Sequence, residues 1–153
     1  MDLALCNEVI RDMDFAEQCV FAASLGYHGL EHSPFTLTGT PQSLTARERA
    51  EQAGIRITGL YWLLVAPEGL SITSPDPGVR QRTREFLLRL IDICAELGGS
   101  VLVHGSPAQR QIAPGEDWQV AYQRAKAIFA ELAERAAAAG VTYCIEPLSE
   151  AET

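Results

Sequence analysis

The sequence has 153 residues, 47% of them hydrophobic and 21% charged, a composition that fits one globular domain and excludes a disordered or fibrous chain. Twelve Lys and Arg residues against twenty Asp and Glu residues give a formal charge of −8, so the chain lacks the basic surface expected of a nucleic-acid binder. The longest apolar stretch, around 59–66, is far shorter than the ~20 residues of a membrane helix. We therefore expect neither nucleic acid nor a membrane as a partner.

The four cysteines contain no CxxC pair and lie in apolar segments, which indicates reduced thiols rather than a disulfide framework or a zinc site. No charged segment followed by an apolar segment opens the sequence, so we expect no cleaved leader. Together these features predict a cytoplasmic protein with all of its cysteines reduced. The cysteines are Cys6, Cys19, Cys94 and Cys144.

The first half of the chain alternates apolar strands with helices. We expect strands at 3–6, 27–32 and 55–62, and helices at 14–25 and 45–53. Asp14 with Glu17 three residues later forms a capping-box pattern at the first helix, and Thr45 with Glu48 forms the same pattern at the second. Each helix is followed by a glycine, the residue that favours the left-handed helix C-cap.

The second half continues this alternation. A loop rich in proline and glycine is expected at 67–78, and loops of that length in compact domains are usually functional. Helices are predicted at 79–97 and 117–139, and strands at 99–104 and 141–146. Glu146 lies at the last position of the final strand, and Pro147 prevents the strand from continuing.

Four units of the chain share one spacing. Six residues beyond the glycine that ends each helix, the chain reaches His32, Leu60, His104 and Glu146. Alternating βα units with short apolar strands fit either a parallel barrel or an open doubly wound sheet. We favour the barrel, because the first turn at 7–12 has no glycine for a dinucleotide fingerprint. We therefore expect no nucleotide cofactor.

The polar residues at several strand ends are the candidate site residues, because barrel active sites lie at the carboxyl ends of the strands. Glu31 and His32 are adjacent, so strand alternation allows at most one of them to face the barrel mouth. His104 could instead be a structural histidine, and Trp62 could be a packing residue rather than a pocket wall. Glu146 is the strongest candidate, because Glu152 supplies a second carboxylate after a short loop.

Four segments of the sequence carry a resemblance to a known family. LGYHGLEHS, AGIRITGL, LGGSVLVHGSP and AGVTYCIEPLSEAET resemble the first five strands of the xylose-isomerase-like TIM-barrel family, which includes sugar-phosphate isomerases, ketose 3-epimerases and hydroxypyruvate isomerases. The most specific segment is 146–153. The resemblance implies a partial α/β barrel, with five strands and about four helices of an eight-stranded TIM barrel in a single domain over 1–153.

The resemblance also implies roles for individual residues. Glu146 is expected to be both the catalytic glutamate and a ligand of a divalent metal ion such as Mn²⁺, Mg²⁺ or Co²⁺. Glu152 and His104 are expected to bind the substrate, and Trp62 and Glu31 are candidate substrate-binding residues at their strand ends. The implied reaction is the isomerisation or epimerisation of a small polyhydroxy carbonyl compound by proton transfer through an enediolate.

Two other functions remain open at this point. The same fold could carry out dehydration of an inosose-type polyol. Alternatively, the chain could be a non-catalytic fragment or scaffold that forms a homo-oligomer, because the family's other metal ligands come from later strands, and the first and fifth strands would have unpaired edges.

Overall fold

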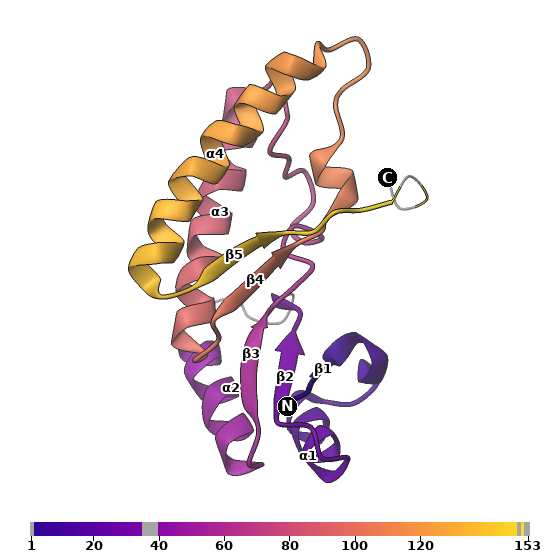
Figure 1. The fold of residues 1–153 in the computed structure, drawn as a ribbon, viewed down its shortest axis with the longest axis vertical. Coiled ribbons are helices and arrows are strands. Elements are labelled where there is room, and N and C mark those ends of the chain that lie inside the picture. The colour runs from indigo at the N-terminus through magenta and orange to yellow at the C-terminus, as the bar shows by residue number, and fades with distance from the viewer. Residues whose placement is uncertain (1, 35–39, 150, 152–153) are drawn as a thin grey trace.

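The computed structural model describes residues 2–34, 40–149 and 151, with the side chains of 40–43 left aside. Its centre is a parallel five-stranded sheet in the order β1-β2-β3-β4-β5, so each strand pairs with the next one along the chain (Figure 1). This sequential parallel order is the pattern of a barrel. The strands are β1 (Ala4–Cys6), β2 (Gly29–His32), β3 (Arg56–Leu60), β4 (Val101–His104) and β5 (Thr142–Ile145).

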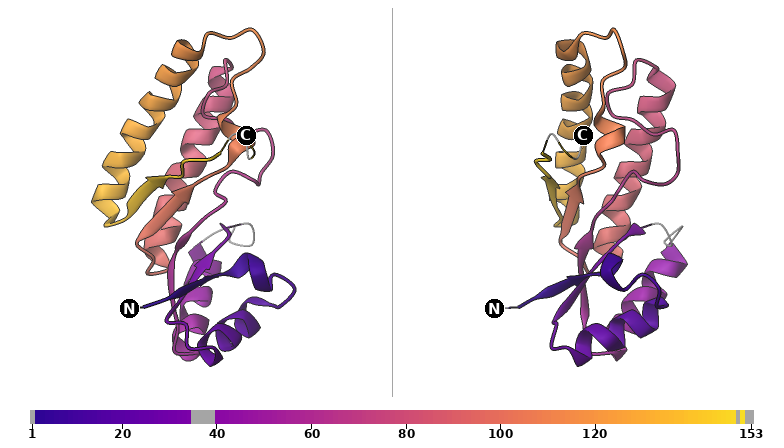
Figure 2. Two further views of the ribbon diagram at one scale, coloured as in Figure 1. Left: turned by 45° about the vertical axis from the view of Figure 1, so that its right-hand side comes forward. Right: turned by 90° about the vertical axis from the view of Figure 1, so that its right-hand side faces the viewer.

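Four helices connect the strands, and each helix contacts the next one along the chain. The two views of Figure 2 show the long helices α3 and α4 side by side on one side of β4 and β5. In the described part of the chain, the 3₁₀ helix η1 (Asn7–Ile10) follows β1 directly, and the 3₁₀ helix η3 (Pro107–Arg110) follows β4 after two residues. The α-helices are α1 (Phe15–Ser24), α2 (Thr40–Gln52), α3 (Pro77–Glu96) and α4 (Trp118–Ala139).

The helix caps follow from local sequence. Asp14 accepts the backbone N–H of Glu17 at 2.9 Å, and the Glu17 carboxylate accepts the backbone N–H of Asp14 at 3.0 Å. The predicted capping box at α1 is therefore confirmed. At the far end of α4, Gly140 adopts the left-handed conformation with φ +69°, which closes the helix without the steric cost that a side chain would bring.

The second predicted helix start is wrong. Helix α2 begins at Thr40, five residues before the expected Thr45, so Thr45 and Glu48 lie inside the helix. A proline at position 41 suits a first helical turn, because its fixed φ is helical and the N–H that it lacks has no partner there in any case. The strands are also one to three residues shorter than predicted, and Glu146 lies just beyond the end of β5 instead of at its last position.

The register of the strands divides the sheet into two faces. Leu30 of β2 lies beside Ile57 of β3, and Leu102 of β4 lies beside both Leu60 of β3 and Tyr143 of β5. Except for the half-buried Tyr143, these side chains are fully or almost fully buried in one core under the helices. The alternate residues along each strand belong to the other face, which is the inner face of a barrel.

Among residues 2–34, 40–149 and 151, no helix combines the length and the apolar character needed to cross a membrane.

Candidate functional site

The strand register places the two candidate glutamates on one face and two histidines on the other. His32 and His104 are in register with Leu60 and Ile145 and are almost completely buried on the helix-facing side. Glu31 is one residue out of phase with His32, and Glu146 is one residue out of phase with Ile145. Alternation therefore directs both glutamates to the inner face, at the carboxyl edge of the sheet.

Three contacts fix the position of Glu146. Its backbone N–H donates to the carbonyl oxygen of His104 at 3.2 Å, and its own carbonyl oxygen accepts from Nη1 of Arg110 at 3.0 Å. Its carboxylate lies over Gly105, where any Cβ would overlap Oε2. The backbone of Glu146 is held from both sides, and the carboxylate occupies the space that the glycine leaves.

Glu31 lies within electrostatic range of Glu146. Burial raises the pKa of the Glu31 carboxyl above its ordinary value, and the negative charge of Glu146 raises it further. A half-buried carboxyl beside a second carboxylate is an arrangement suited to acid–base work. The structure thus brings together two of the predicted site residues.

His104 is not at the predicted position in the pocket. It is completely buried behind β4, where Nδ1 lies 2.6 Å from the hydroxyl of Tyr143 and the ring makes an edge contact with Phe129 at 5.4 Å between centroids. Burial and the nearby charge of Arg110 lower the pKa of His104 to about 4. His104 lies two residues after Leu102 on β4, so both side chains point to the helix-facing side of the sheet. The position of His104 at the end of the strand does not by itself show which side it faces.

A groove of about 560 Å³ lies at the carboxyl ends of β1, β2 and β3, where η1 and the start of α1 also line it, and its lining does not include Glu31 or Glu146. Trp62 lies at its edge, with 37% of its surface exposed and its ring 5.7 Å from that of Tyr61. Trp62 has a left-handed backbone with φ +53°, an uncommon conformation for a residue with a side chain and one that is concentrated at functional sites. The placement of Trp62 agrees with a role as a pocket wall.

A buried polar network forms the floor of this groove. Asn7 lies at its centre and makes hydrogen bonds to Gln18, His32, Ser33 and Tyr61. Burial, together with the nearby Cys6 and Glu8, raises the pKa of Tyr61 well above its ordinary value, so its hydroxyl stays protonated. The floor is therefore preorganised and neutral.

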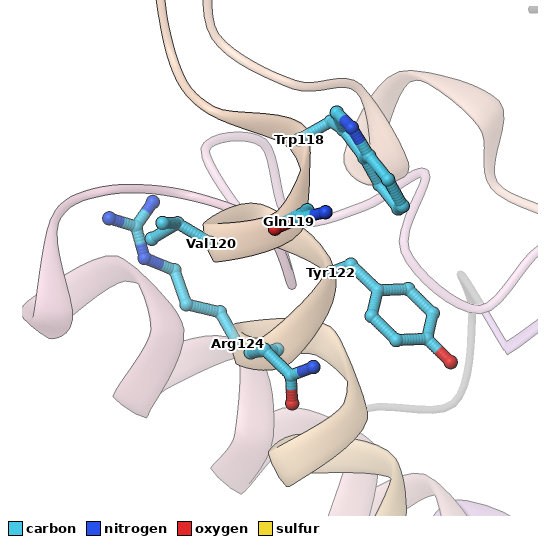
Figure 3. A pocket seen from close by; sticks show the side chains of 6 residues that line it. Trp118, Gln119, Val120, Tyr122 and Arg124 are labelled. Atoms are coloured by element: carbon cyan, nitrogen blue, oxygen red, sulfur yellow. The ribbon is translucent and has the colours of Figure 1, made fainter.

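A second hollow, of about 800 Å³, lies at the first turns of α4. Figure 3 shows Trp118 and Tyr122 on one side of the helix and Val120 and Arg124 on the other. Its lining contains no carboxylate, histidine or cysteine, so it offers no acid–base group. We do not assign the reaction to it.

A family model described as xylose isomerase-like TIM barrel matches residues 19–153. The chain belongs to this family. A search of curated proteins found no match.

Solved structures share the fold of this xylose isomerase-like barrel. A D-psicose 3-epimerase from Clostridium cellulolyticum H10 superposes with a TM-score of 0.80 at 21% identity, over 100% of this chain and 54% of that one. A D-allulose 3-epimerase from Methylomonas sp. gives 0.69 at 22% identity, over 88% and 46%. An L-ribulose 3-epimerase gives 0.70 at 20% identity, over 97% and 50%. The chain thus spans about half the length of these structures.

The described part of this xylose isomerase-like barrel does not form a complete metal site. Within residues 2–34, 40–149 and 151, no three His, Cys, Asp or Glu side chains converge as metal ligands. Glu31 and Glu146 provide two carboxylates, too few to hold a divalent ion without other donors. The remaining candidate, Glu152, lies outside the described residues. The four cysteines are free thiols, as expected.

Three residues of the xylose isomerase-like barrel were missed as site residues by sequence reasoning. Asn7 follows β1 directly, and a polar residue at a strand exit is the signal that could have identified it. Gly105 matters through the side chain that it lacks, and Arg110 through a contact with the backbone of Glu146. Neither of these two contributions leaves a pattern in the sequence.

Proposed function

We propose that the protein is a sugar isomerase or epimerase that acts on a small polyhydroxy carbonyl compound. The observation that carries this proposal is the position of Glu146, whose carboxylate lies at the open carboxyl edge of a xylose isomerase-like barrel, with Glu31 within electrostatic range. In barrel enzymes this edge is where catalytic residues are found.

The proposed chemistry is a proton transfer. The Glu146 carboxylate removes a proton from the carbon next to the substrate carbonyl, and the electron pair of the broken C–H bond moves into the carbonyl to form an enediolate. Return of the proton to the former carbonyl carbon, with transfer of the adjacent hydroxyl proton to the former carbonyl oxygen, gives the isomer. Return of a proton to the opposite face of the same carbon restores the carbonyl and gives the epimer. The contacts of Glu146 with His104, Gly105 and Arg110 support this role, because a general base must be held within hydrogen-bond reach of the proton that it removes.

We further propose that Glu146 is the ligand that this part of the chain contributes to a divalent ion such as Mn²⁺, Mg²⁺ or Co²⁺. A bound ion would polarise the carbonyl and an adjacent hydroxyl. The described residues do not complete such a site, so the remaining ligands would have to come from elsewhere. No step above depends on the ion.

The groove beside β1 to β3 is the proposed binding site for the rest of the substrate. Trp62 and Tyr61 offer aromatic surfaces for the apolar faces of a sugar, and pockets of this kind combine apolar walls with a few fixed polar groups. Two of the similar structures are described as a D-psicose 3-epimerase with D-tagatose and one in the presence of D-fructose. Ketoses of this size are therefore the first compounds to test.

The test is interconversion of ketoses by the intact protein, measured with and without added Mn²⁺, Mg²⁺ or Co²⁺. Glu146→Gln should reduce turnover by about two orders of magnitude or more, because an amide cannot accept the proton. Glu134→Gln, on the exposed surface of α4, is the matched control and should retain activity. Full activity in Glu146→Gln would refute the assignment.

One observation favours a second function, self-association. In the described residues, β1 and β5 each pair with one neighbour only, and Ile145 of β5 is 53% exposed. Unpaired strand edges and exposed apolar side chains favour contact with another chain. Sedimentation velocity should then show a concentration-dependent dimer, and Ile145→Lys should shift it to monomer. A monomer at all concentrations would exclude this function.

A further inference from the structure

The groove contains a histidine that the proposed reaction does not use. His32 lies at the end of β2 and lines the groove, with only 3% of its surface exposed. Its ring stacks on Phe15, with 4.8 Å between centroids and 25° between planes. A polar side chain this deeply buried needs hydrogen-bond partners, and these partners determine what it can bind.

Two hydrogen bonds fix the orientation of the Asn7 side chain. The backbone N–H of Ser33 donates to Oδ1 of Asn7 at 3.1 Å, and the hydroxyl of Tyr61 donates to the same atom at 2.7 Å. A backbone N–H can only donate, so the atom that it contacts must be the amide oxygen. Nδ2 of Asn7 is therefore the atom that lies 2.9 Å from Nδ1 of His32.

The orientation of Gln18 is fixed in the same way. Its Nε2 donates to the carbonyl oxygens of Ile10, at 3.3 Å, and Met13, at 3.1 Å. Its Oε1 is then the acceptor for Nδ2 of Asn7 at 3.2 Å. Asn7 thus uses both of its N–H groups, one toward Gln18 and one toward His32, and both lone-pair positions of its oxygen are occupied.

The network decides the tautomer of His32. Nδ1 accepts a hydrogen bond from the Nδ2–H group of Asn7 and therefore carries no proton itself, so the ring proton of the neutral imidazole is on Nε2. Among the described residues, Nε2 makes no hydrogen bond, and the ring borders the groove. The result is a single N–H group at a fixed position that is not used by the described part of the chain.

We propose that Nε2–H of His32 is a substrate-binding donor, which holds a hydroxyl or carbonyl oxygen of a polyhydroxy compound in the groove. The proposal rests on the proposed function for the class of ligand and on the Asn7 network for the position of the donor. An uncharged donor suits an uncharged sugar oxygen, because the group at the site then loses little on desolvation.

The surroundings keep His32 neutral. Burial lowers its pKa to about 4, and protonation of Nδ1 would place its proton against the N–H of Asn7. Three charged residues also line the groove around it, namely Glu8, Arg11 and Asp14. The donor should therefore be present at neutral pH without titrating.

The first arm of the test needs no ligand. Long-range ¹H–¹⁵N correlation spectra of the intact protein at pH 7 report the tautomer of each histidine. We expect His32 to show a protonated Nε2 and an unprotonated Nδ1. A proton on Nδ1 would overturn the inference whatever the protein's activity.

The second arm is titration with D-fructose, D-tagatose and L-ribulose. The spectra follow Nε2 of His32 together with the amides of Gly105 and Glu146. Shifts at both places support this inference and the proposed function. A shift at Gly105 and Glu146 alone overturns the role of His32 and leaves the proposed function standing. A shift at His32 alone supports the donor and counts against Glu146, and no shift at saturating ketose overturns both.

A matched pair of variants completes the test. In His32→Asn, the shorter amide can still accept from Asn7 at the former Nδ1 position but does not reach the position of Nε2. We expect its affinity for the ketose that binds to fall about tenfold, the loss expected for one hydrogen bond left unmade. The loss of the ring stacked on Phe15 should also lower stability, and urea denaturation measures that effect separately. His28→Asn, outside the groove lining, should bind normally. Unchanged affinity in a folded His32→Asn variant would contradict the proposal.

Discussion

The carboxylate of Glu146 lies in the space that Gly105 leaves by having no side chain. A Cβ at position 105 would overlap Oε2 of Glu146. Gly105 follows β4 and Glu146 follows β5, and the N–H of Glu146 donates to the carbonyl of His104 at 3.2 Å. The absence of a side chain just after β4 therefore leaves the space that the proposed base occupies just after β5.

Gly105→Ala should displace the Glu146 carboxylate. The overlapping atom is the end of the exposed Glu146 side chain, so the carboxylate can move aside at a small cost in stability, and activity should fall because the base moves away from its position. The measurement is a double-mutant cycle with Glu146→Ala, followed by urea denaturation. The destabilisation by Gly105→Ala should largely disappear in the Glu146→Ala background, because the overlapping oxygen is gone. Additive effects would show that the two residues do not interact.

Tyr143→Phe should destabilise the fold without affecting the groove. It removes the hydroxyl next to Nδ1 of His104, and Nε2 of that ring already has no partner among the described residues. A fully buried imidazole would then have no hydrogen bond there, at a cost of about 1–3 kcal/mol. Chemical denaturation measures this cost. Tyr122→Phe, on the exposed side of α4, is the control and should change stability by much less.

Stability should fall in mild acid because of two buried histidines. Burial lowers the pKa of both His32 and His104 from 6.5 to about 4. In the unfolded chain they take up protons near pH 6.5, whereas the folded chain resists protonation until about pH 4. The free energy of unfolding therefore decreases as the pH falls through this window, by about 3 kcal/mol per histidine as an order of magnitude.

The raised pKa of Glu31 acts in the opposite direction, because the folded chain binds that proton more readily than the unfolded chain does. Urea denaturation between pH 7 and pH 4 measures the sum of these contributions. The slope should become clearly smaller in His32→Asn, which removes one of the two histidine contributions. An identical slope in the variant would contradict the assigned cause.

Asn7→Asp should change the protonation of His32. A carboxylate in place of the amide has no N–H to donate, so Nδ1 of His32 would become a donor and the charged imidazole would gain a partner. We expect the pKa of His32 to rise from about 4 toward its ordinary value or above. An NMR titration of the ring measures this change, with His104 as an internal reference. A pKa that stays near 4 would show that the amide does not control the tautomer.

The sequence was sufficient to predict the order of strands and helices, because periodicity, the glycine after each helix and the capping box at Asp14 are local signals. It also indicated that Glu146 lies at the carboxyl edge of the sheet, where the structure places it just beyond β5, whereas its catalytic role stays a prediction. It did not predict the start of α2, which begins at Thr40, five residues before the expected Thr45. The strand-end position suggested a pocket role for His104, but strand pairing places that residue under the helices.

The groove could not be predicted in detail, for a different reason. The contacts of Asn7 join residues from the ends of three strands and from α1, and such distances along the chain leave no periodic pattern. Glu31 and Glu146 are likewise neighbours only after the sheet has formed and curved. Local sequence therefore indicates which residues end the strands, whereas pairing decides which of them meet.

The proposed function requires Glu146 to exchange a proton with the carbon next to a ketose carbonyl. NMR of a ketose incubated with the intact protein in D₂O measures this exchange. We expect deuterium to enter at that carbon with the unmodified protein and with Glu134→Gln, and exchange to fall to background with Glu146→Gln. Exchange at an unchanged rate in Glu146→Gln would show that Glu146 is not the base.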